Sequence, residues 1–492
     1  MRFRSTAWLM PALLLAVPAL AAGNEGKTLA ELIGPPAGET APVGPATPVP
    51  APPSPAAATT PAAPETQTGA SKKASAPIRY AAVSDDPRPA LDPGTFIHTM
   101  RAAEAYQVIA EGGGWPTLPP GVLKAGDQGP AVAALKQRLG LTGDLSAEAL
   151  PGDRFDAAVA GAVRRFQARH GLPETGVVRE RTLQALNVPA ETRARQLVAS
   201  AQRLVGSRFP FGERYVVVNI PSATVEAVEG GAVRRRYVAV VGKKDRPSPT
   251  LMARITDVNF NPTWTVPVSL IKKDIIPHVR KDPAYLAKMK IRLLDGKGQE
   301  VDPAKIDWST DKAANYTVRQ DPGAINSLGQ VRIDMPNRHA VYLHDTPSKK
   351  LFAQDARFHS SGCVRVGDVR AFAEWLLAGT GTPTGGAWGT AEIEASIATG
   401  QRQDVKLAKP VPVAWVYLTG YALPDGTVQF RDDVYGLDRE PPPAPAPAKD
   451  FVTSSIKPKT PAAPAPLPAS SPGSDRAAPK DRAAATSPPA RL

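Results

Sequence analysis

The distribution of proline limits which part of this 492-residue chain can form a packed core. Eleven prolines lie between Pro35 and Pro64, and fourteen lie from Pro441 to the end, in Ala- and Ser-rich stretches with almost no aromatic residues. Such sequence buries too little apolar surface to offset chain entropy. We therefore predict disordered Pro/Ala-rich segments at 23–81 and 439–492. The remainder, about 82–438, is long enough for two or three domains of about 100–200 residues each.

The first 22 residues have the features of a secretory signal peptide. Arg2 and Arg4 precede an apolar run from Ala7 to Leu20, and Ala19-Leu20-Ala21 offers small residues for cleavage. The run is shorter than the roughly 20 apolar residues that span a bilayer, so a retained membrane anchor is the less favoured alternative. We expect export to the periplasm and no stable membrane insertion after cleavage.

The net charge of +13 allows binding to nucleic acid, anionic lipid or an anionic wall polymer. The export signal argues against nucleic acid, and the Lys and Arg residues are dispersed along the chain. We therefore expect a basic solvated surface with weak attraction to an anionic envelope, and no nucleic-acid partner.

The chain has one cysteine, Cys363, so it cannot form an internal disulfide. A free thiol is a liability in an oxidising compartment. Either chemistry at this thiol or its burial as a small hydrophobic side chain has to account for it.

Apolar residues recur at helical spacing in the first half of the packed region. The pattern predicts a helix around 100–110 within a scaffold segment (82–122), then three short helices separated by glycines (123–190). We assign residues 191–213 to a helical connection.

From Arg214 on, runs of β-forming residues replace the helical period, which predicts an α+β fold. After the candidate site described next, Asp368 is a good N-cap for a helix with Phe372 and Leu376 on one face. Residues of about 268–320 are charged and partly helical, and they interrupt the strand series as an insertion. Strands are predicted at 215–220, 224–228, 237–241, 255–260, 331–335 and 339–343.

Residues that can take part in catalysis are concentrated in two segments, Tyr342-Leu343-His344-Asp345-Thr346-Pro347 and Ser360-Ser361-Gly362-Cys363-Val364-Arg365. Acyl transfer by a cysteine needs a thiolate, a base and backbone N–H groups directed at the developing oxyanion. Among six histidines, His344 ends a predicted strand, whereas His359 is the one serious local rival as base. Gly362 permits a tight turn in which the amides of residues 362 and 363 would face a carbonyl oxygen. The residues alone favour His344 and leave His359 open.

Two segments carry a family resemblance. His344-Asp345-Thr346-Pro347, followed nineteen residues after the histidine by the cysteine of Ser-Ser-Gly-Cys-Val-Arg, resembles the signature of the L,D-transpeptidase catalytic domain. The family commonly has a histidine two residues before the cysteine; Ser361 stands there, as in the large periplasmic members. The helical unit resembles the three-helix peptidoglycan-binding module of wall enzymes in Gly126, Gly129, Val132, Leu135, Leu139, Phe155, Val163, Phe166, Gly171, Gly176, Thr182, Leu183 and Leu186.

The resemblance implies a β-rich L,D-transpeptidase catalytic domain (214–438) whose insert forms a capping lobe over the donor site. Cys363 would be the nucleophile and His344 the general base and acid. Gly362, Tyr342 and Ser361 would support the oxyanion and the base. The substrate-binding candidates are Arg365, Trp264 and Thr346; a structural ion pair for Arg365 and core packing for Trp264 and Tyr342 remain open.

The implied reaction forms 3–3 cross-links in peptidoglycan through a thioester with a tetrapeptide stem and releases D-alanine. We expect no cofactor and no metal, and we expect wall stem peptides, with other wall-synthesis enzymes, as partners. The alternatives are a zinc-dependent wall peptidase and a non-catalytic wall-binding protein. The acceptor stays open among a second stem, a lysine of an anchored outer-membrane protein and water.

Overall fold

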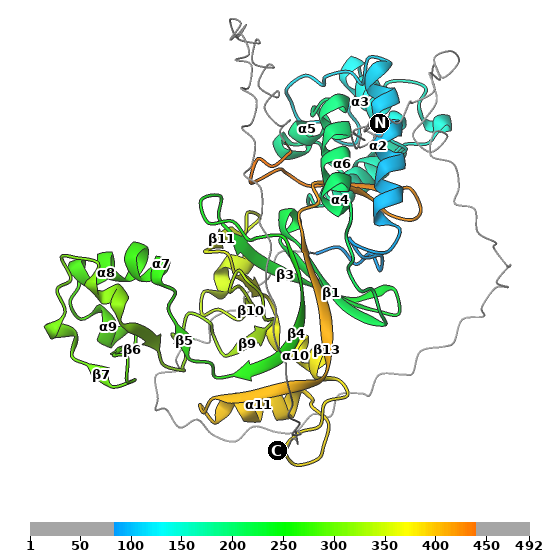
Figure 1. Cartoon of the computed structure of the whole chain (residues 1–492). Helices are drawn as coiled ribbons and strands as arrows, with labels where there is room; N and C mark the ends of the chain where they lie inside the picture. The colour runs from blue at the N-terminus through cyan, green and yellow to red at the C-terminus, as the bar shows by residue number, and fades with distance from the viewer. Residues whose placement is uncertain (1–82, 439–492) are drawn as a thin grey trace, which may run out of the picture. The chain divides into compact units, whose positions relative to one another are not determined.

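The computed structural model describes residues 83–438 (Figure 1). The predicted signal peptide (1–22), the linker (23–81) and the C-terminal tail (439–492) lie outside the described residues. Within the described residues, no helix has the length and apolar character needed to cross a membrane.

Two groups of helices precede the strands, as predicted. Helix α2 (Thr95–Glu111) packs against α6 (Ala190–Leu204), because Tyr106 and Leu197 belong to one apolar cluster with residues of the late hairpin β14 (Gly420–Ala422) and β15 (Val428–Phe430). Between α2 and α6, a second apolar cluster joins α3 (Pro130–Leu141), α4 (Ala157–Arg169) and α5 (Glu180–Leu186). Asp156 caps α4 by accepting a hydrogen bond from the Val159 amide (3.0 Å).

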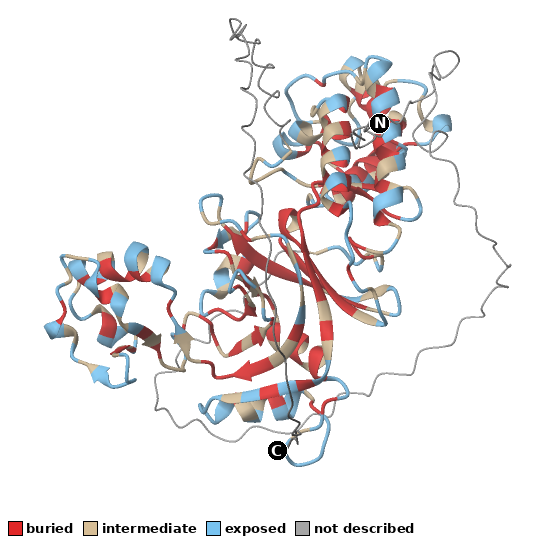
Figure 2. Cartoon of the chain, in the orientation of Figure 1, coloured by how far each residue is buried: buried red, intermediate tan, exposed pale blue. Residues whose placement is uncertain are grey.

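The strands form a closed barrel. Their order is β11-β3-β12-β10-β9-β4-β13-β1-β2, and β2 also pairs with β3, which closes the ring. Most of these strands are buried along much of their length (Figure 2). The bounds are β1 (Arg214–Asn219), β2 (Thr224–Glu229), β3 (Ala232–Gly242), β4 (Leu251–Phe260), β9 (Val331–Asp334), β10 (Leu343–His344), β11 (Phe358–Ser360), β12 (Val364–Val366) and β13 (Gln403–Val416).

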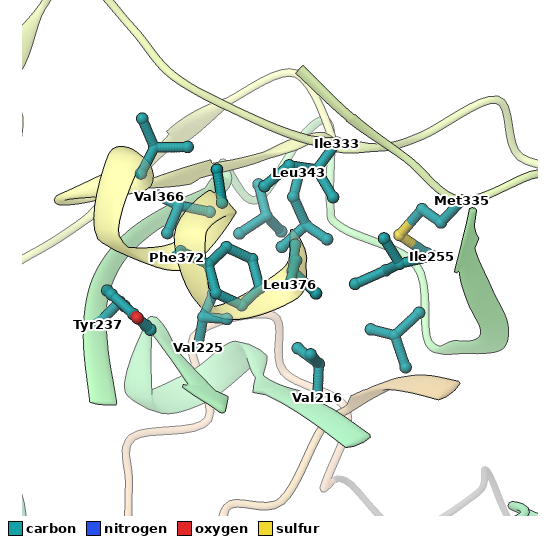
Figure 3. Close-up of a cluster of buried hydrophobic side chains, with 14 of the residues drawn as sticks. Val216, Val225, Tyr237, Ile255, Ile333, Met335, Leu343, Val366, Phe372 and Leu376 are labelled. Carbon is teal, nitrogen blue, oxygen red and sulfur yellow. The ribbon is translucent and has the colours of Figure 1, made fainter. Parts of the chain in front are cut away.

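One helix packs against the apolar side chains of the barrel strands. Phe372 and Leu376 of α10 (Val369–Leu377) point among strand residues that include Val216, Leu343 and Val366 (Figure 3). Helix α11 (Thr390–Ala398) adds Ile393 and Ile397 to the same cluster. The predicted α+β class is confirmed, and the strand that carries His344 is fixed by the main core.

The insertion is a lobe with its own sheet and core. Its strands are ordered β5 (Trp264–Thr265), β8 (Thr317–Gln320), β6 (Ile291–Leu294) and β7 (Glu300–Val301). Its helical turns are α7 (Val268–Leu270), η3 (Ile271–Ile275), α8 (Ile276–Lys281) and α9 (Tyr285–Lys288). The sequence predicted the helical part and missed the sheet, because strands of two to four residues give too short an alternation to recognise.

Two local predictions are wrong. The strand expected at 339–343 is reduced to Leu343–His344, because Asn337 Oδ1 accepts the amides of His339 and Val341 and Ala340 has φ = 52°. Asp368 precedes α10 but does not cap it; its carboxylate pairs with Arg235 instead.

We predict that Phe372→Ala lowers the free energy of unfolding of the barrel by about 3–5 kcal/mol, because it leaves a cavity in the best-packed part of the core. Chemical denaturation followed by tryptophan fluorescence measures the loss, and Phe372→Leu should lose clearly less. An equal loss for both variants would contradict this account of the core.

Candidate active site

The pairing of two short strands brings the predicted site residues together. Strand β10 runs parallel to β12 with Leu343 opposite Val364 and His344 opposite Arg365. Leu343 and Val364 are fully buried in the main core. Because side chains alternate along a strand, His344 and Arg365 lie on the opposite face.

Cys363 comes directly before β12 and lies next to Tyr342. The Tyr342 carbonyl accepts the Val364 amide (3.1 Å), which extends the pairing by one residue and places Cys363 beside Tyr342. The Tyr342 ring meets the His344 ring edge to face at 5.6 Å between centroids. Cys363, Tyr342, His344 and Arg365 therefore form one cluster.

His344 is buried, and its Nδ1 has no hydrogen-bond partner within the described residues. Burial, followed by the positive charge of Arg365, lowers the pKa of His344 to about 3, although the backbone near Asp345 and Leu328 counters this in part. An unsatisfied buried nitrogen costs roughly 1–3 kcal/mol and calls for a functional explanation. The Tyr342 carbonyl accepts the Val364 amide, and the expected support of His344 by Tyr342 stays a prediction.

The thiol of Cys363 is held in its neutral form. Desolvation raises its pKa to about 11, and interactions with Tyr342 and the arginines Arg332 and Arg365 reduce that rise only in part. A neutral thiol beside a neutral imidazole favours proton transfer during the attack over a resting thiolate–imidazolium pair.

The loop that carries Cys363 is held by residues distant in the sequence. The buried Ser248 hydroxyl donates to the Gly362 carbonyl (2.7 Å) and accepts the Gly242 amide (2.9 Å). The Tyr435 hydroxyl donates to the Gly242 carbonyl (2.6 Å) and accepts the Ser248 amide (3.3 Å). Gly362 has φ = 116°, a conformation that favours glycine. No sequence pattern singles out Ser248 or Tyr435, because both residues contact the loop only in the folded chain.

The two predicted oxyanion donors, the amides of Gly362 and Cys363, differ in whether another group of the protein already accepts their hydrogen bond. The Gly362 amide donates to Ser360 Oγ (3.2 Å), so it is not directed at a substrate. The Cys363 amide has no acceptor within residues 83–438. The prediction is therefore corrected to the Cys363 amide alone, because the Ser360 side chain folds back under the turn.

Arg365 is a cation without an acidic partner in the described part of the chain. No ion pair involves it, and its Nε is buried without an acceptor. Burial lowers its pKa, and the nearby Cys363 raises it. The open alternative of a structural ion pair is thus disfavoured, whereas neighbouring Arg332 does pair with Asp334 (2.5 Å).

The remaining candidates have different surroundings. Trp264 packs against the core of the lobe and interacts with the Tyr342 hydroxyl. Ser361 is exposed and accepts a hydrogen bond from Arg246 (3.1 Å), which also pairs with Asp274 of the lobe (2.7 Å). Thr346 is buried and accepts the Ser348 amide (3.2 Å), so it supports a turn and lines no open surface.

The rival histidine lies apart from the cluster. His359 is exposed on β11, and its Nε2 contacts Gln354 Oε1 (2.9 Å) and the Ala356 carbonyl (3.0 Å). Within residues 83–438, no three His, Cys, Asp or Glu side chains are grouped closely enough to hold a metal ion.

Two family models match the chain. Residues 213–391 match the "L,D-transpeptidase catalytic domain", and residues 128–186 match the "Putative peptidoglycan binding domain". A curated protein of Haemophilus influenzae, named "Putative L,D-transpeptidase", is 33% identical over 246 residues. The match covers 50% of this chain and 48% of that protein, so the chain spans about half the length of this relative.

Solved structures of the same description also align. An L,D-transpeptidase from Stackebrandtia nassauensis aligns with 53% of this chain and 90% of its own, at 14% identity and a TM-score of 0.23. An L,D-transpeptidase from Mycobacterium smegmatis aligns with 41% of this chain and 58% of its own, at 13% identity and a TM-score of 0.19.

We predict that the rate of Cys363 alkylation by iodoacetamide rises about tenfold per pH unit from pH 6 to 10, because the thiolate reacts and the pKa is raised to about 11. Mass spectrometry over that pH range measures the rate. In urea the alkylation rate of the same thiol should level off above its ordinary pKa of about 8.5. A plateau that begins below pH 8 in the folded protein would instead demonstrate a resting ion pair.

We predict that Ser248→Ala lowers the free energy of unfolding by about 1–3 kcal/mol, because two buried backbone groups lose their partner. Amide exchange of residues 360–366 should accelerate in the same variant. The control is Ser269→Ala, on an exposed lobe position. Unchanged exchange at 360–366 would show that Ser248 does not hold this loop.

Proposed function

We propose that this chain, whose residues 213–391 match the L,D-transpeptidase catalytic domain, is a peptidoglycan L,D-transpeptidase that works through a thioester on Cys363. One observation supports the proposal most: the pairing of β10 with β12 brings Cys363, Tyr342 and His344 together, and the Nδ1 of His344 has no hydrogen-bond partner in the described part of the chain. A buried ring nitrogen of this kind is suited to receive a proton from the thiol.

The first half-reaction transfers an acyl group to sulfur. The donor is a wall tetrapeptide, and the attacked carbonyl joins its third residue, a diamino acid, to the terminal D-alanine. His344 takes the Cys363 proton as the S–C bond forms, and it gives this proton to the leaving nitrogen as the C–N bond breaks. D-alanine leaves, and the thioester remains.

The second half-reaction regenerates the free thiol of Cys363. The side-chain amine of a second stem attacks the thioester carbonyl, the C–S bond breaks, and the amine proton passes through His344 to Cys363. The product is a 3–3 cross-link. A neutral imidazole is required at the start of both steps, which agrees with the lowered pKa of His344.

Two groups stabilise negative charge during these steps. The Cys363 amide, which has no acceptor among the described residues, is the oxyanion donor, a contribution of roughly 2.7–4 kcal/mol. The unpaired guanidinium of Arg365, close to the sulfur, holds a carboxylate of the donor peptide. Arg246 joins Asp274 of the lobe to Ser361 of the loop before Cys363, and Trp264 of the lobe interacts with Tyr342, so the lobe covers the donor.

The cellular setting follows from the substrate. Peptidoglycan lies outside the cytoplasmic membrane, so the enzyme acts in the periplasm after export, and the helical module at 128–186 holds the wall. Other wall-synthesis enzymes supply its tetrapeptide donors. Carbapenems, which present a strained carbonyl to the thiolate, acylate Cys363.

We predict that carbapenem adds one mass increment to the protein and that Cys363→Ala abolishes it. His344→Ala should slow the acylation about 10²–10⁴-fold, because the general base is lost. The matched control is His359→Ala, which removes the exposed histidine and should acylate at the normal rate. Near-normal acylation of His344→Ala, or a deficit only in His359→Ala, would refute the assignment of the base.

A further inference from the structure

A short turn, residues 326–330, lies between the last strand of the lobe and strand β9. Asn326 is fully buried, and its side-chain amide donates to the carbonyls of Pro262 (3.1 Å) and Asp321 (2.9 Å). These two residues belong to the two connections between the lobe and the barrel. The turn is therefore fixed to both ends of the lobe. We call residues 326–330 the junction turn.

The carboxylate of Asp345 holds the other end of the junction turn. Asp345 directly follows His344 and is buried. Its Oδ2 accepts the Gln330 amide (3.0 Å), and its Oδ1 pairs with Lys349. Its own amide donates to the Val331 carbonyl (2.8 Å), which extends the pairing of β10 with β9 by one residue. Both the side chain and the main chain of Asp345 therefore determine where the turn lies.

The contact between this carboxylate and the turn leaves no room for a side chain. Gly329 has φ = 63°, and a Cβ atom added to it would lie 2.4 Å from Asp345 Oδ2 and 2.5 Å from Asp345 Cγ. Both the backbone conformation and the close approach require glycine at this position. The carboxylate thus packs directly on the main chain of the turn, and neither can shift without the other.

The junction turn also contacts His344. Burial lowers the pKa of His344, and interactions with the backbone of Asp345 and of Leu328 oppose this effect. A main-chain group raises the pKa of an imidazole when its carbonyl oxygen accepts a hydrogen bond from the ring, because that bond favours the protonated form. The Leu328 carbonyl, in the middle of the junction turn, therefore faces the His344 ring.

We propose that the Asp345 carboxylate is a positioning residue for His344. It fixes the junction turn, and the Leu328 carbonyl of that turn holds the imidazole in one orientation and one tautomer. The inference rests on the proposed function, in which His344 takes the proton of Cys363. Asp345 acts through the turn and not on the reacting atoms.

The acceptor oxygen of Asp345 matters more for this role than its charge. The Lys349 side chain is 34% exposed, so its ion pair with Asp345 contributes little. The Gln330 amide, in contrast, donates to a buried oxygen, and it loses this acceptor when the side chain is truncated. Asp345→Asn keeps such an oxygen, whereas Asp345→Ala removes it.

The first experiment measures the acylation of Cys363 by a carbapenem over a range of concentrations, using the full chain. Asp345→Ala should lower the rate at saturation about 10–100-fold and leave the apparent binding constant unchanged, because the base is displaced and the donor site is intact. Asp345→Asn should restore most of the rate. A folded Asp345→Ala protein with the unmodified rate, or an equal deficit in both variants, would overturn the proposal.

The matched control for this experiment is Asp282→Ala. Asp282 also accepts a main-chain amide, that of Ala284 (3.1 Å), and also pairs with a lysine, Lys288 (2.7 Å). It lies in the lobe and has no contact with the junction turn. Asp282→Ala should therefore be acylated at the rate of the unmodified chain.

A second pair of variants leaves Asp345 in place. Gly329→Ala inserts a methyl group against its carboxylate, whereas Gly323→Ala adds one at φ = 140° in the same connection, where nothing lies within 4 Å. Gly329→Ala should be acylated at least about tenfold more slowly than Gly323→Ala. Equal rates for the two glycine variants would contradict the proposal, even where Asp345→Ala does not fold.

A spectroscopic measurement separates positioning from a general loss of stability. In protein with isotope-labelled histidine, the nitrogen shifts of the ring report the tautomer of His344, and His344→Gln identifies its signals. We expect one tautomer in the unmodified chain and in Gly323→Ala, and a mixture in Gly329→Ala. One tautomer in all three proteins would reject the proposal. A failure of the proposed function is visible separately, because the carbapenem would then leave Cys363 of the unmodified chain free.

Discussion

The desolvation of one thiol and one imidazole in the wall of a closed barrel is the constraint on which the site depends. The main core fixes Leu343 and Val364, and the alternation of side chains along β10 and β12 then places His344 and Arg365 on the other face. The same burial that positions the pair raises the pKa of Cys363 and lowers that of His344. Position and protonation state thus have a single cause.

Strand pairing alone does not set the loop before β12. That loop contains Gly362 at φ = 116° and depends on Ser248, which follows β3, and on Tyr435, which follows the late hairpin. Tyr435 also receives its own support from Tyr417, through a stacked ring (5.3 Å) and the hydroxyl that accepts its amide (2.8 Å). The last described residues therefore take part in shaping the turn beside the sulfur.

Much of this could be predicted from the sequence where the signal is local. The helices of the first half, the early strands and α10 follow from periodicity, and the spacing of His344 and Cys363 carries the family resemblance. The rest depends on contacts between distant segments. In the sequence Ser248 is an ordinary loop serine, and only the fold brings it to Gly362. The Gly362 amide donates to Ser360 Oγ, and this contact depends on a side-chain conformation that no sequence pattern predicts. The four short strands of the lobe pair only after its core has formed.

A thiol kept neutral at rest would also let one free cysteine persist in the oxidising compartment that the predicted export implies. Oxidation proceeds through the thiolate, as nucleophilic attack does, so a raised pKa slows both in the empty enzyme. In the proposed mechanism a bound donor changes this balance, because its carbonyl would accept the electron pair while His344 accepts the proton and the Cys363 amide faces the oxyanion. Arg365, which forms no ion pair within residues 83–438, lies close enough to Cys363 to interact with it electrostatically. The proposed mechanism therefore links the reactivity of the thiol to occupancy of the site, since the charges that appear during attack are compensated only when the peptide is present.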